Sequence, residues 1–142
     1  MTNKFLIVIG LFFSITSYAN DFLTLDDMII DSSDIEESSR DKGSSSFVMG
    51  RKWKDGVLPI VFDSNLSNYQ RNLFASACKA WEDVSIVKCI EGNPKKKHIF
   101  VQNRKAGCFA SLGRGSIISR KRVINLGLGC WTRGVIIHEI GH

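Results

Sequence analysis

The apolar and polar positions divide the chain into a leader, a polar stretch and a longer body. An apolar run from Phe5 to Phe13 follows Lys4, and Ser17-Tyr18-Ala19 ends in the small-residue pattern that signal peptidase cuts. These features predict a signal peptide that ends at Ala19. The alternative, an uncleaved membrane anchor, is disfavoured because the run is short and polar residues soon follow it. We expect no later segment to cross a membrane.

The body shows helical periodicity in two segments and strand character in several others. Ser67 and Gln70 form a capping-box pattern before apolar residues that recur about every fourth position, which predicts a helix. Residues 131–142 are apolar on most sides and predict a second, buried helix. Pro59 marks the first predicted strand as an edge or irregular strand. The predicted strands are GVLPIVFD (56–63), SIVKCI (85–90), HIFVQ (98–102) and RVINL (122–126).

Charge separates the polar stretch from the body. Residues 20–42 contain eight acidic and two basic side chains, whereas residues 43–142 contain six acidic and sixteen basic ones. The Asp/Ser/Glu-rich stretch has too few apolar residues to form a core of its own. Its charge is opposite to that of the body, so we expect it to lie on the body until it is removed. The alternative is a solvated flexible tail.

Export would place the four cysteines in an oxidising compartment, where pairing into two disulfides is the default. Four cysteines allow three connectivities, and their spacing alone does not choose among them. The cysteines are Cys78, Cys89, Cys108 and Cys130.

The most specific chemical signal is His-Glu-Ile-Gly-His at residues 138–142. A spacing of four on a helix stacks His138 over His142, so both imidazoles can face one zinc ion. Glu139 is turned about 100° away from His138 and is a candidate general base for a zinc-activated water. The alternative is two core histidines without a metal, but burying three such polar groups without a role is unfavourable. A catalytic zinc site needs a third protein ligand, which we expect beyond His142.

Several segments together resemble the astacin family of secreted zinc metalloendopeptidases, which are metzincins. The similarity runs from Lys52 to His142 in the family's order and includes the cysteine just before the second helix. It implies an α+β fold: a zincin-like N-terminal subdomain with a twisted mixed sheet and two helices, the second carrying the zinc motif, and no C-terminal subdomain. The segments are KWKDGVLPIVFD (52–63), AWEDVS (80–85), GCFASLGR (107–114) and VINLGLGCWTRGVIIHEIGH (123–142).

The resemblance also implies roles for single residues. His138 and His142 match zinc ligands, and Glu139 matches the general base. A Cys108–Cys130 bridge would join the strand beside the cleft to the zinc helix. Substrate would pair with that strand near Phe109, Ala110 and Ser111.

Two departures from the family pattern concern the cysteines and the prosegment. The family cysteine aligns with Ile86, so a local Cys78–Cys89 bridge is the simplest replacement. The family's prosegment often has a Phe-x-Gly-Asp stretch whose aspartate occupies the open metal position. The nearest match here is DSSDI, which makes Asp34 a candidate zymogen switch because a carboxylate is a good zinc ligand.

The organisation that we expect has three parts: a signal peptide (1–19), an acidic prosegment or linker (20–43) and a partial astacin-like peptidase domain (44–142). An activating protease of trypsin-like specificity would cut after Arg40 or Lys42. The chain as given should be an inactive fragment, since it lacks a third zinc ligand.

The function that we expect is that of a secreted zinc-dependent endopeptidase, made as a zymogen, with Zn²⁺ as cofactor and protein or peptide substrates. We expect no nucleic acid partner, and no membrane after signal cleavage. One alternative is a secreted, disulfide-bonded basic module or inactive protease relative that binds acidic polysaccharide or nucleic acid through Lys95–Lys97 and residues 119–123. Another is a zinc peptidase of a different clan with a downstream glutamate ligand.

Overall fold

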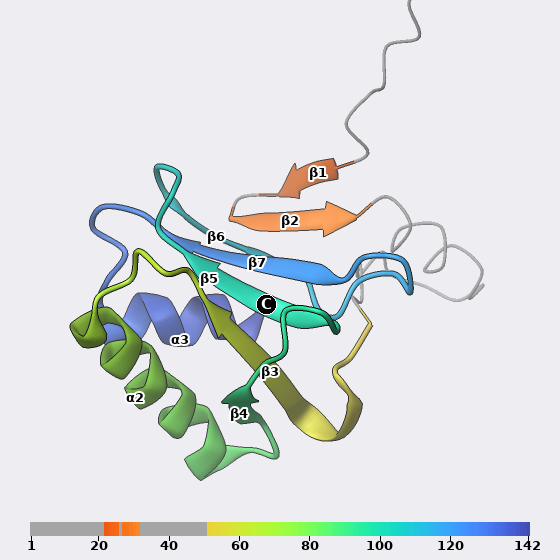
Figure 1. Cartoon of the computed structure of the whole chain (residues 1–142), viewed down its shortest axis with the longest axis horizontal. Coiled ribbons are helices and arrows are strands. Elements are labelled where there is room, and N and C mark those ends of the chain that lie inside the picture. Colours follow the sequence, from red (N-terminus) through yellow and green to blue (C-terminus); the bar gives the residue numbers. More distant parts are fainter. Residues whose placement is uncertain (1–21, 26, 32–50) are drawn as a thin grey trace, which may run out of the picture.

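The computed structural model describes residues 22–25, 27–31 and 51–142, which form one mixed sheet with two helices on one face (Figure 1). The predicted signal peptide, Asp34 and the cleavage points at Arg40 and Lys42 lie outside the described residues. The elements are β1 (Phe22–Leu25), β2 (Met28–Asp31), a 3-10 turn η1 (Lys54–Gly56), β3 (Val57–Phe62), α2 (Asn68–Val84), β4 (Lys88–Glu91), β5 (His98–Gln102), β6 (Cys108–Ser111), β7 (Lys121–Leu126) and α3 (Arg133–Gly141).

The seven strands have the order β1-β2-β6-β7-β5-β3-β4. The central strand β5 is parallel to both β3 and β7, whereas β6 runs antiparallel to β7. The β1–β2 hairpin extends the sheet beyond β6, and β2 is parallel to β6. Part of the acidic stretch therefore forms strands on the body's sheet, which was not predicted from the sequence.

Pro59 led us to expect an edge or irregular strand, and β3 is not at the edge of the sheet, although its first half has only one paired neighbour. β3 lies between two parallel neighbours, pairing with β4 from Val57 to Ile60 and with β5 from Ile60 to Phe62. Pro59 is tolerated because it precedes the β5 pairing, so the strand has a single paired neighbour at the residue that lacks an N–H donor.

Both predicted helices are present and contact each other on the same face of the sheet (Figure 1). The capping box of α2 forms as expected: the Ser67 hydroxyl accepts from the Gln70 backbone N–H, and the Gln70 side chain accepts from the Ser67 N–H. The prediction that the second helix is buried holds for only part of its surface. In α3 only Ile136 and Glu139 are buried, since its partners α2, β6 and β7 cover one side of the helix.

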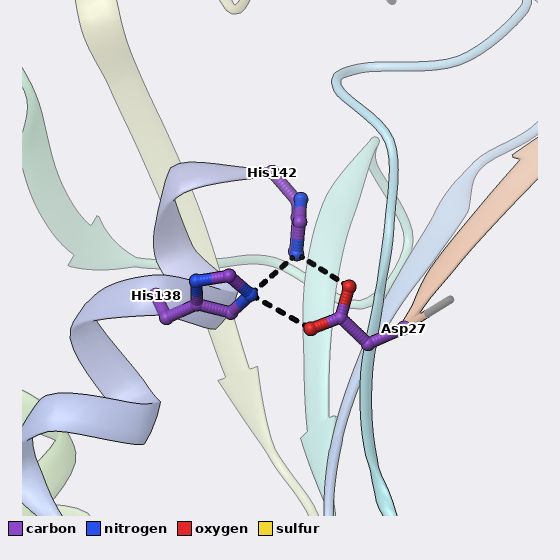
Figure 2. Close-up of side chains that lie close together, drawn as sticks. All are labelled: Asp27, His138 and His142. Atoms are coloured by element: carbon purple, nitrogen blue, oxygen red, sulfur yellow. Dashed lines mark hydrogen bonds and ion pairs between the residues drawn. The ribbon is translucent and has the colours of Figure 1, made fainter. Parts of the chain in front are cut away.

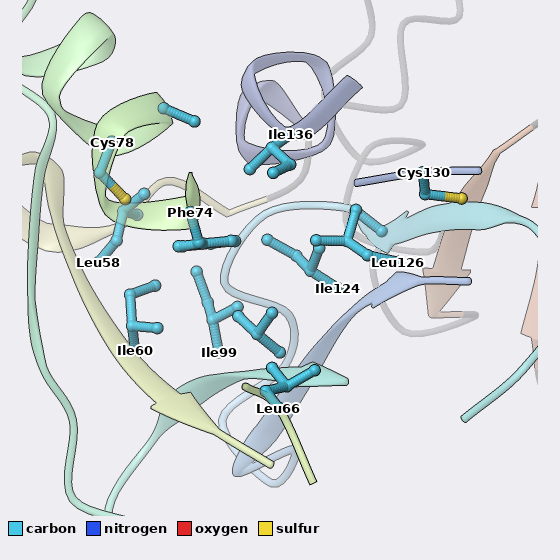
Figure 3. Close-up of a cluster of buried hydrophobic side chains, with 13 residues drawn as sticks. Leu58, Ile60, Leu66, Phe74, Cys78, Ile99, Ile124, Leu126, Cys130 and Ile136 are labelled. Carbon is cyan, nitrogen blue, oxygen red and sulfur yellow. The ribbon is translucent and has the colours of Figure 1, made fainter. Parts of the chain in front are cut away.

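The core lies between this helical layer and the sheet (Figure 3). Phe74 of α2 is 1% exposed and packs edge-on against Phe62 with ring centroids 5.5 Å apart. Ile136 points from α3 into the same cluster and is fully buried. This packing fixes α3 relative to the sheet and so determines where the His-Glu-Ile-Gly-His residues lie. Among the described residues, no helix is both long and apolar enough to cross a bilayer.

Candidate metal centre

His138 and His142 meet at the end of α3 and point toward one carboxylate, that of Asp27 (Figure 2). Their Nε2 atoms are 3.1 Å apart, and their rings are nearly perpendicular. His138 Nε2 donates to Asp27 Oδ2 at 2.7 Å, and His142 Nε2 lies 3.2 Å from Asp27 Oδ1. One donor atom from each of the three residues lies within 4.8 Å of the others. The fold therefore brings two nitrogen donors and one oxygen donor to a single point.

Hydrogen bonds to the backbone fix the segments that carry these three side chains. Thr132 caps the start of α3, where its hydroxyl accepts from the Val135 N–H at 3.4 Å. At the other end, the Gly113 N–H donates to the His142 carbonyl at 2.8 Å, which ties the helix end to the loop after β6. The Ala110 N–H donates to the Asp27 carbonyl at 2.9 Å. Asp27 is thus positioned by the β2–β6 pairing, and the histidines by the packing of α3.

Glu139 follows His138 in the sequence, and its side chain is buried inside the fold. Its side chain is 2% exposed, and its Oε2 atom has no hydrogen-bond partner among the described residues. Burial, with a smaller contribution from the Asp27 charge, raises the pKa of Glu139 to about 7, although His138 opposes the shift. A carboxylate with a pKa near neutrality and no competing partner is suited to accepting and releasing a proton.

The charges at the site are coupled. Burial alone would raise the pKa of Asp27, but the hydrogen bond from His138 and the charge of His142 outweigh it and hold that pKa below its usual range. Burial lowers the pKa of His142 from its usual range, against the opposing effect of Asp27. Asp27 is therefore ionised at neutral pH, and a neutral His142 is favoured, which is the form of histidine that binds metals.

Comparison with known proteins shows the family of the chain. The family model for Astacin, a peptidase family, matches residues 47–142. The chain belongs to the astacin family. It is 34% identical over 102 residues to Bone morphogenetic protein 1 of Xenopus laevis, covering 72% of this chain and 14% of that protein. It is also 33% identical over 93 residues to Zinc metalloproteinase nas-39 of Caenorhabditis elegans, covering 65% and 10%.

A solved structure also shares the fold. It is High choriolytic enzyme 1, a hatching enzyme zinc-protease from Oryzias latipes (medaka fish), with a TM-score of 0.56 and 26% identity. The match covers 71% of this chain and 50% of that one, so the chain spans half of this structural neighbour and a smaller share of the two relatives above. The expected α+β subdomain of mixed sheet and two helices is confirmed.

The strand that the astacin-family resemblance assigns to substrate is β6, and both of its edges are paired here. Phe109 and Ala110 face β7, while Ala110 and Ser111 face Met28 and Ile29 of β2. The Leu112 N–H continues this pairing by donating to the Ile29 carbonyl at 3.0 Å. A peptide that pairs with the outer edge of β6 would therefore have to displace β2.

The four cysteines are joined in the pairing that was expected. The Cys108–Cys130 bridge connects β6 to the segment just before α3, with Cα atoms 5.6 Å apart. Cys78–Cys89 connects α2 to β4, with Cα atoms 5.9 Å apart. The first bridge ties β6 to the helix that carries the two histidines, and the second ties the helical layer to the far edge of the sheet.

Sequence reasoning missed Asp27. It favoured Asp34, which lies outside the described residues, on a short local match to the family's prosegment motif. A usable signal was nevertheless present: Asp27 directly precedes Met28-Ile29-Ile30, the apolar triplet that forms β2. If a short apolar segment pairs as a strand, that pairing also fixes the position of the acidic residue directly before it. Asp34, in contrast, has a single apolar neighbour, Ile35.

Proposed function

We propose that this astacin-family chain belongs to a secreted zinc endopeptidase that is made as an inactive precursor. The observation that carries the proposal is the convergence of His138 Nε2 and His142 Nε2 at the end of the helix that also carries the buried carboxyl group of Glu139. Secretion is supported by the predicted signal peptide, and the peptidase activity by the zinc proteases among the relatives.

The residues present fit a zinc ion. Imidazole nitrogen and carboxylate oxygen are zinc's usual ligands, and two nitrogens bound at about 2.0–2.1 Å to a tetrahedral zinc lie roughly 3.3 Å apart. The two Nε2 atoms are 3.1 Å apart, close to that separation before any ion is bound. When bound, zinc would lower the pKa of a water and polarise the scissile carbonyl of a peptide. Of the described residues, Asp27, His138 and His142 would hold it.

Glu139 is the proposed general base. It follows the first histidine on α3, so its backbone is fixed by the same helix that carries both ligands. Its buried Oε2 atom, which has no hydrogen-bond partner among the residues that the structure describes, could accept the proton of the attacking water and then protonate the leaving amine. A pKa of about 7 places the carboxyl near the pH at which proton transfer in both directions is efficient.

The proposal of an inactive precursor rests on the positions of β2 and Asp27. Asp27 contacts both histidines, and β2 pairs with the outer edge of β6 where a substrate backbone would bind. We therefore place the zymogen switch at Asp27 in place of Asp34. Cleavage after Arg40 or Lys42 by a trypsin-like protease would separate this segment from the body and allow it to leave.

The catalytic part is tested in the whole protein with Glu139→Gln. We expect zinc, measured by competition with a chromophoric chelator, to stay bound while peptide hydrolysis is lost by at least about 100-fold. His138→Ala should instead release zinc. A Glu139→Gln protein that keeps every measured activity would favour the alternative, a basic binding module or inactive relative.

The precursor part is tested separately with Asp27→Ala. In the uncleaved variant the zinc affinity should change, because the carboxylate no longer reaches the metal ligands. Peptide hydrolysis should exceed that of the uncleaved wild type only in proportion to the molecules in which β2 has separated from β6. Asp83→Ala is the matched control, since Asp83 is an exposed aspartate whose partner is Lys79 on α2. If Asp27→Ala and Asp83→Ala behave alike, Asp27 is not the switch.

A further inference from the structure

The loop between β6 and β7 exposes two adjacent isoleucines. Ile117 is 83% exposed and Ile118 is 91% exposed, within the sequence LGRGSIISRK at residues 112–121. Single exposed apolar residues are common, but two neighbours at a loop tip form a small apolar surface that water does not favour. Their exposure indicates a binding surface only if the loop has a fixed structure that keeps both side chains in solvent.

The base of this loop is held by a buried arginine. Arg122 is 3% exposed, and its guanidinium donates to the Leu112 carbonyl at 2.6 Å and to the Gly113 carbonyl at 3.2 Å. Gly115 lies against the same guanidinium with a φ of +66°, and a Cβ there would overlap the Arg122 side chain. Glycine is therefore needed both for the left-handed backbone and for the space.

The tip is held from the other side by Lys97. Its ammonium group donates to the carbonyls of Arg114, at 3.3 Å, and of Ser116. The Ser119 N–H donates to the Ser116 hydroxyl at 3.3 Å and closes the turn around the two isoleucines. These contacts hold the loop backbone, so the exposed pair is presented by a defined structure.

Basic residues flank the tip in two segments. Residues 95–97 are three lysines, and residues 120–121 are an arginine and a lysine. Residues 120–121 lie beside residues 95–97, because β5 and β7 pair in parallel with His98 opposite Lys121, and the His98 N–H donates to the Arg120 carbonyl at 2.9 Å. In Figure 1 both segments lie at the end of the sheet where β5 and β7 begin.

We propose that this end of the sheet binds the surface of an anionic lipid bilayer. Ile117 and Ile118 would enter the headgroup boundary. The exposed side chains of Lys95, Lys96, Arg120 and Lys121 would contact lipid phosphates and carboxylates. A sulfated polysaccharide would satisfy the cations but would gain nothing from two exposed isoleucines, so the pair favours lipid. This surface departs from the sequence-based expectation of no membrane partner.

The proposed surface adjoins the metal centre. Gly113, at the start of the loop, donates to the His142 carbonyl at 2.8 Å. Lipid binding through this loop would thus place the proposed peptidase site close to the membrane, next to substrates held there. The lipid contact does not depend on catalysis, so it can be tested without measuring hydrolysis.

The first test reads insertion locally, on chain collected from the culture medium after secretion. Ile118→Cys is labelled with an environment-sensitive fluorophore, and Ile86→Cys, at a position 74% exposed, is the matched control. With vesicles of phosphatidylcholine and phosphatidylserine, the label at 118 should brighten and shift to the blue, while the label at 86 should not. An equal response at both positions, or none at 118, would overturn the proposal.

The second test measures affinity by vesicle flotation. Ile117→Ser with Ile118→Ser should weaken binding to the anionic vesicles by at least about tenfold, since each buried isoleucine side chain contributes strongly to insertion. Arg120→Gln with Lys121→Gln should weaken it about fivefold per charge, and binding should fall with added salt. The control Val84→Ser with Ile86→Ser, at residues 80% and 74% exposed, should bind as wild type does. Retention on heparin with no vesicle binding by any variant would assign the surface to polysaccharide and refute the lipid proposal.

Discussion

Replacing Asn125 with alanine should destabilise the fold by about 3 kcal/mol. Asn125 is fully buried in β7, where its Nδ2 group donates to the carbonyls of Lys105 and Gly107, each at 2.9 Å. Its Oδ1 atom accepts from the Lys105 N–H at 3.1 Å and from the Gln102 side chain at 3.3 Å. One side chain thus fixes the turn that leads into β6, the strand that pairs with both β7 and β2.

The magnitude follows from these four contacts. A hydrogen bond within a protein contributes a net of about 1 kcal/mol, and a buried group left without a partner costs about 1–3 kcal/mol. Two effects reduce the total: Gly107 keeps a bond from the Gly127 N–H, and Lys105 is exposed, so water can reach part of its backbone. An estimate of about 3 kcal/mol therefore lies below the sum of four bonds and their orphaned partners.

Urea unfolding followed by circular dichroism measures this loss, provided that the slope of the transition is unchanged between variants. Asn103→Ala is the matched control, because Asn103 is an exposed asparagine in the same turn and should change stability by less than about 0.5 kcal/mol. Asn125→Asp keeps the shape and the accepting oxygen but loses both donated bonds, so it should also be destabilised. A loss below about 1 kcal/mol in Asn125→Ala would show that the turn is not held by this side chain.

Three further predictions concern the core, the bridges and pH. Ile136→Ala removes a fully buried side chain from α3 and should cost about 3 kcal/mol in urea unfolding, with a matching fall in zinc affinity if α3 shifts. Replacing Cys108 and Cys130 together with serine should cost about 3 kcal/mol, because the unfolded chain loses a cross-link and gains conformational entropy. Non-reducing peptide maps of the wild type should show these two cysteines joined. The hydrogen bond from Arg104 holds the pKa of Asp63 below its usual range. The stability that the pair provides is therefore present at neutral pH and is lost as the pH falls through the folded-state pKa. The difference in unfolding midpoint between wild type and Asp63→Asn should shrink on acidification.

The elements that the sequence predicted are those whose signal is local. The predicted strand at residues 98–102 has the bounds of β5, and the capping-box pattern places the start of α2. The predicted strand at residues 85–90 begins later, at Lys88, for a reason that is also local. The Ser85 hydroxyl donates to the Trp81 carbonyl and accepts from the Val87 N–H, so these residues close the end of α2 and leave β4 to start after them.

The elements that could not be predicted depend on distant partners. β1 and β2 are four residues each, so they are too short to give a clear strand pattern in the sequence. Ile30 is nonetheless 2% exposed, because the β2–β6 pairing carries it onto the body. The same pairing brings Asp27 to His138, which is 111 positions away in the sequence. A search for a short aspartate motif could not recover this contact, whereas the two histidines four residues apart on one helix could be predicted from spacing alone.

The arrangement also indicates what keeps the proposed precursor closed. The side chains of His138 and Asp27 are 59% and 33% exposed, and ion pairs so accessible to water contribute under about 1 kcal/mol. Burial of the Ile30 side chain contributes more, about 1.5–3 kcal/mol, and the Asp27 and Ile29 carbonyls each accept a backbone bond from β6 or the residue after it. Strand pairing therefore holds the segment, and Asp27 is placed on the metal ligands as a consequence of that pairing. Because the closure resides in β2, cutting the chain beyond Asp31 would leave the site covered until β2 separates from β6, which is a local opening of the sheet.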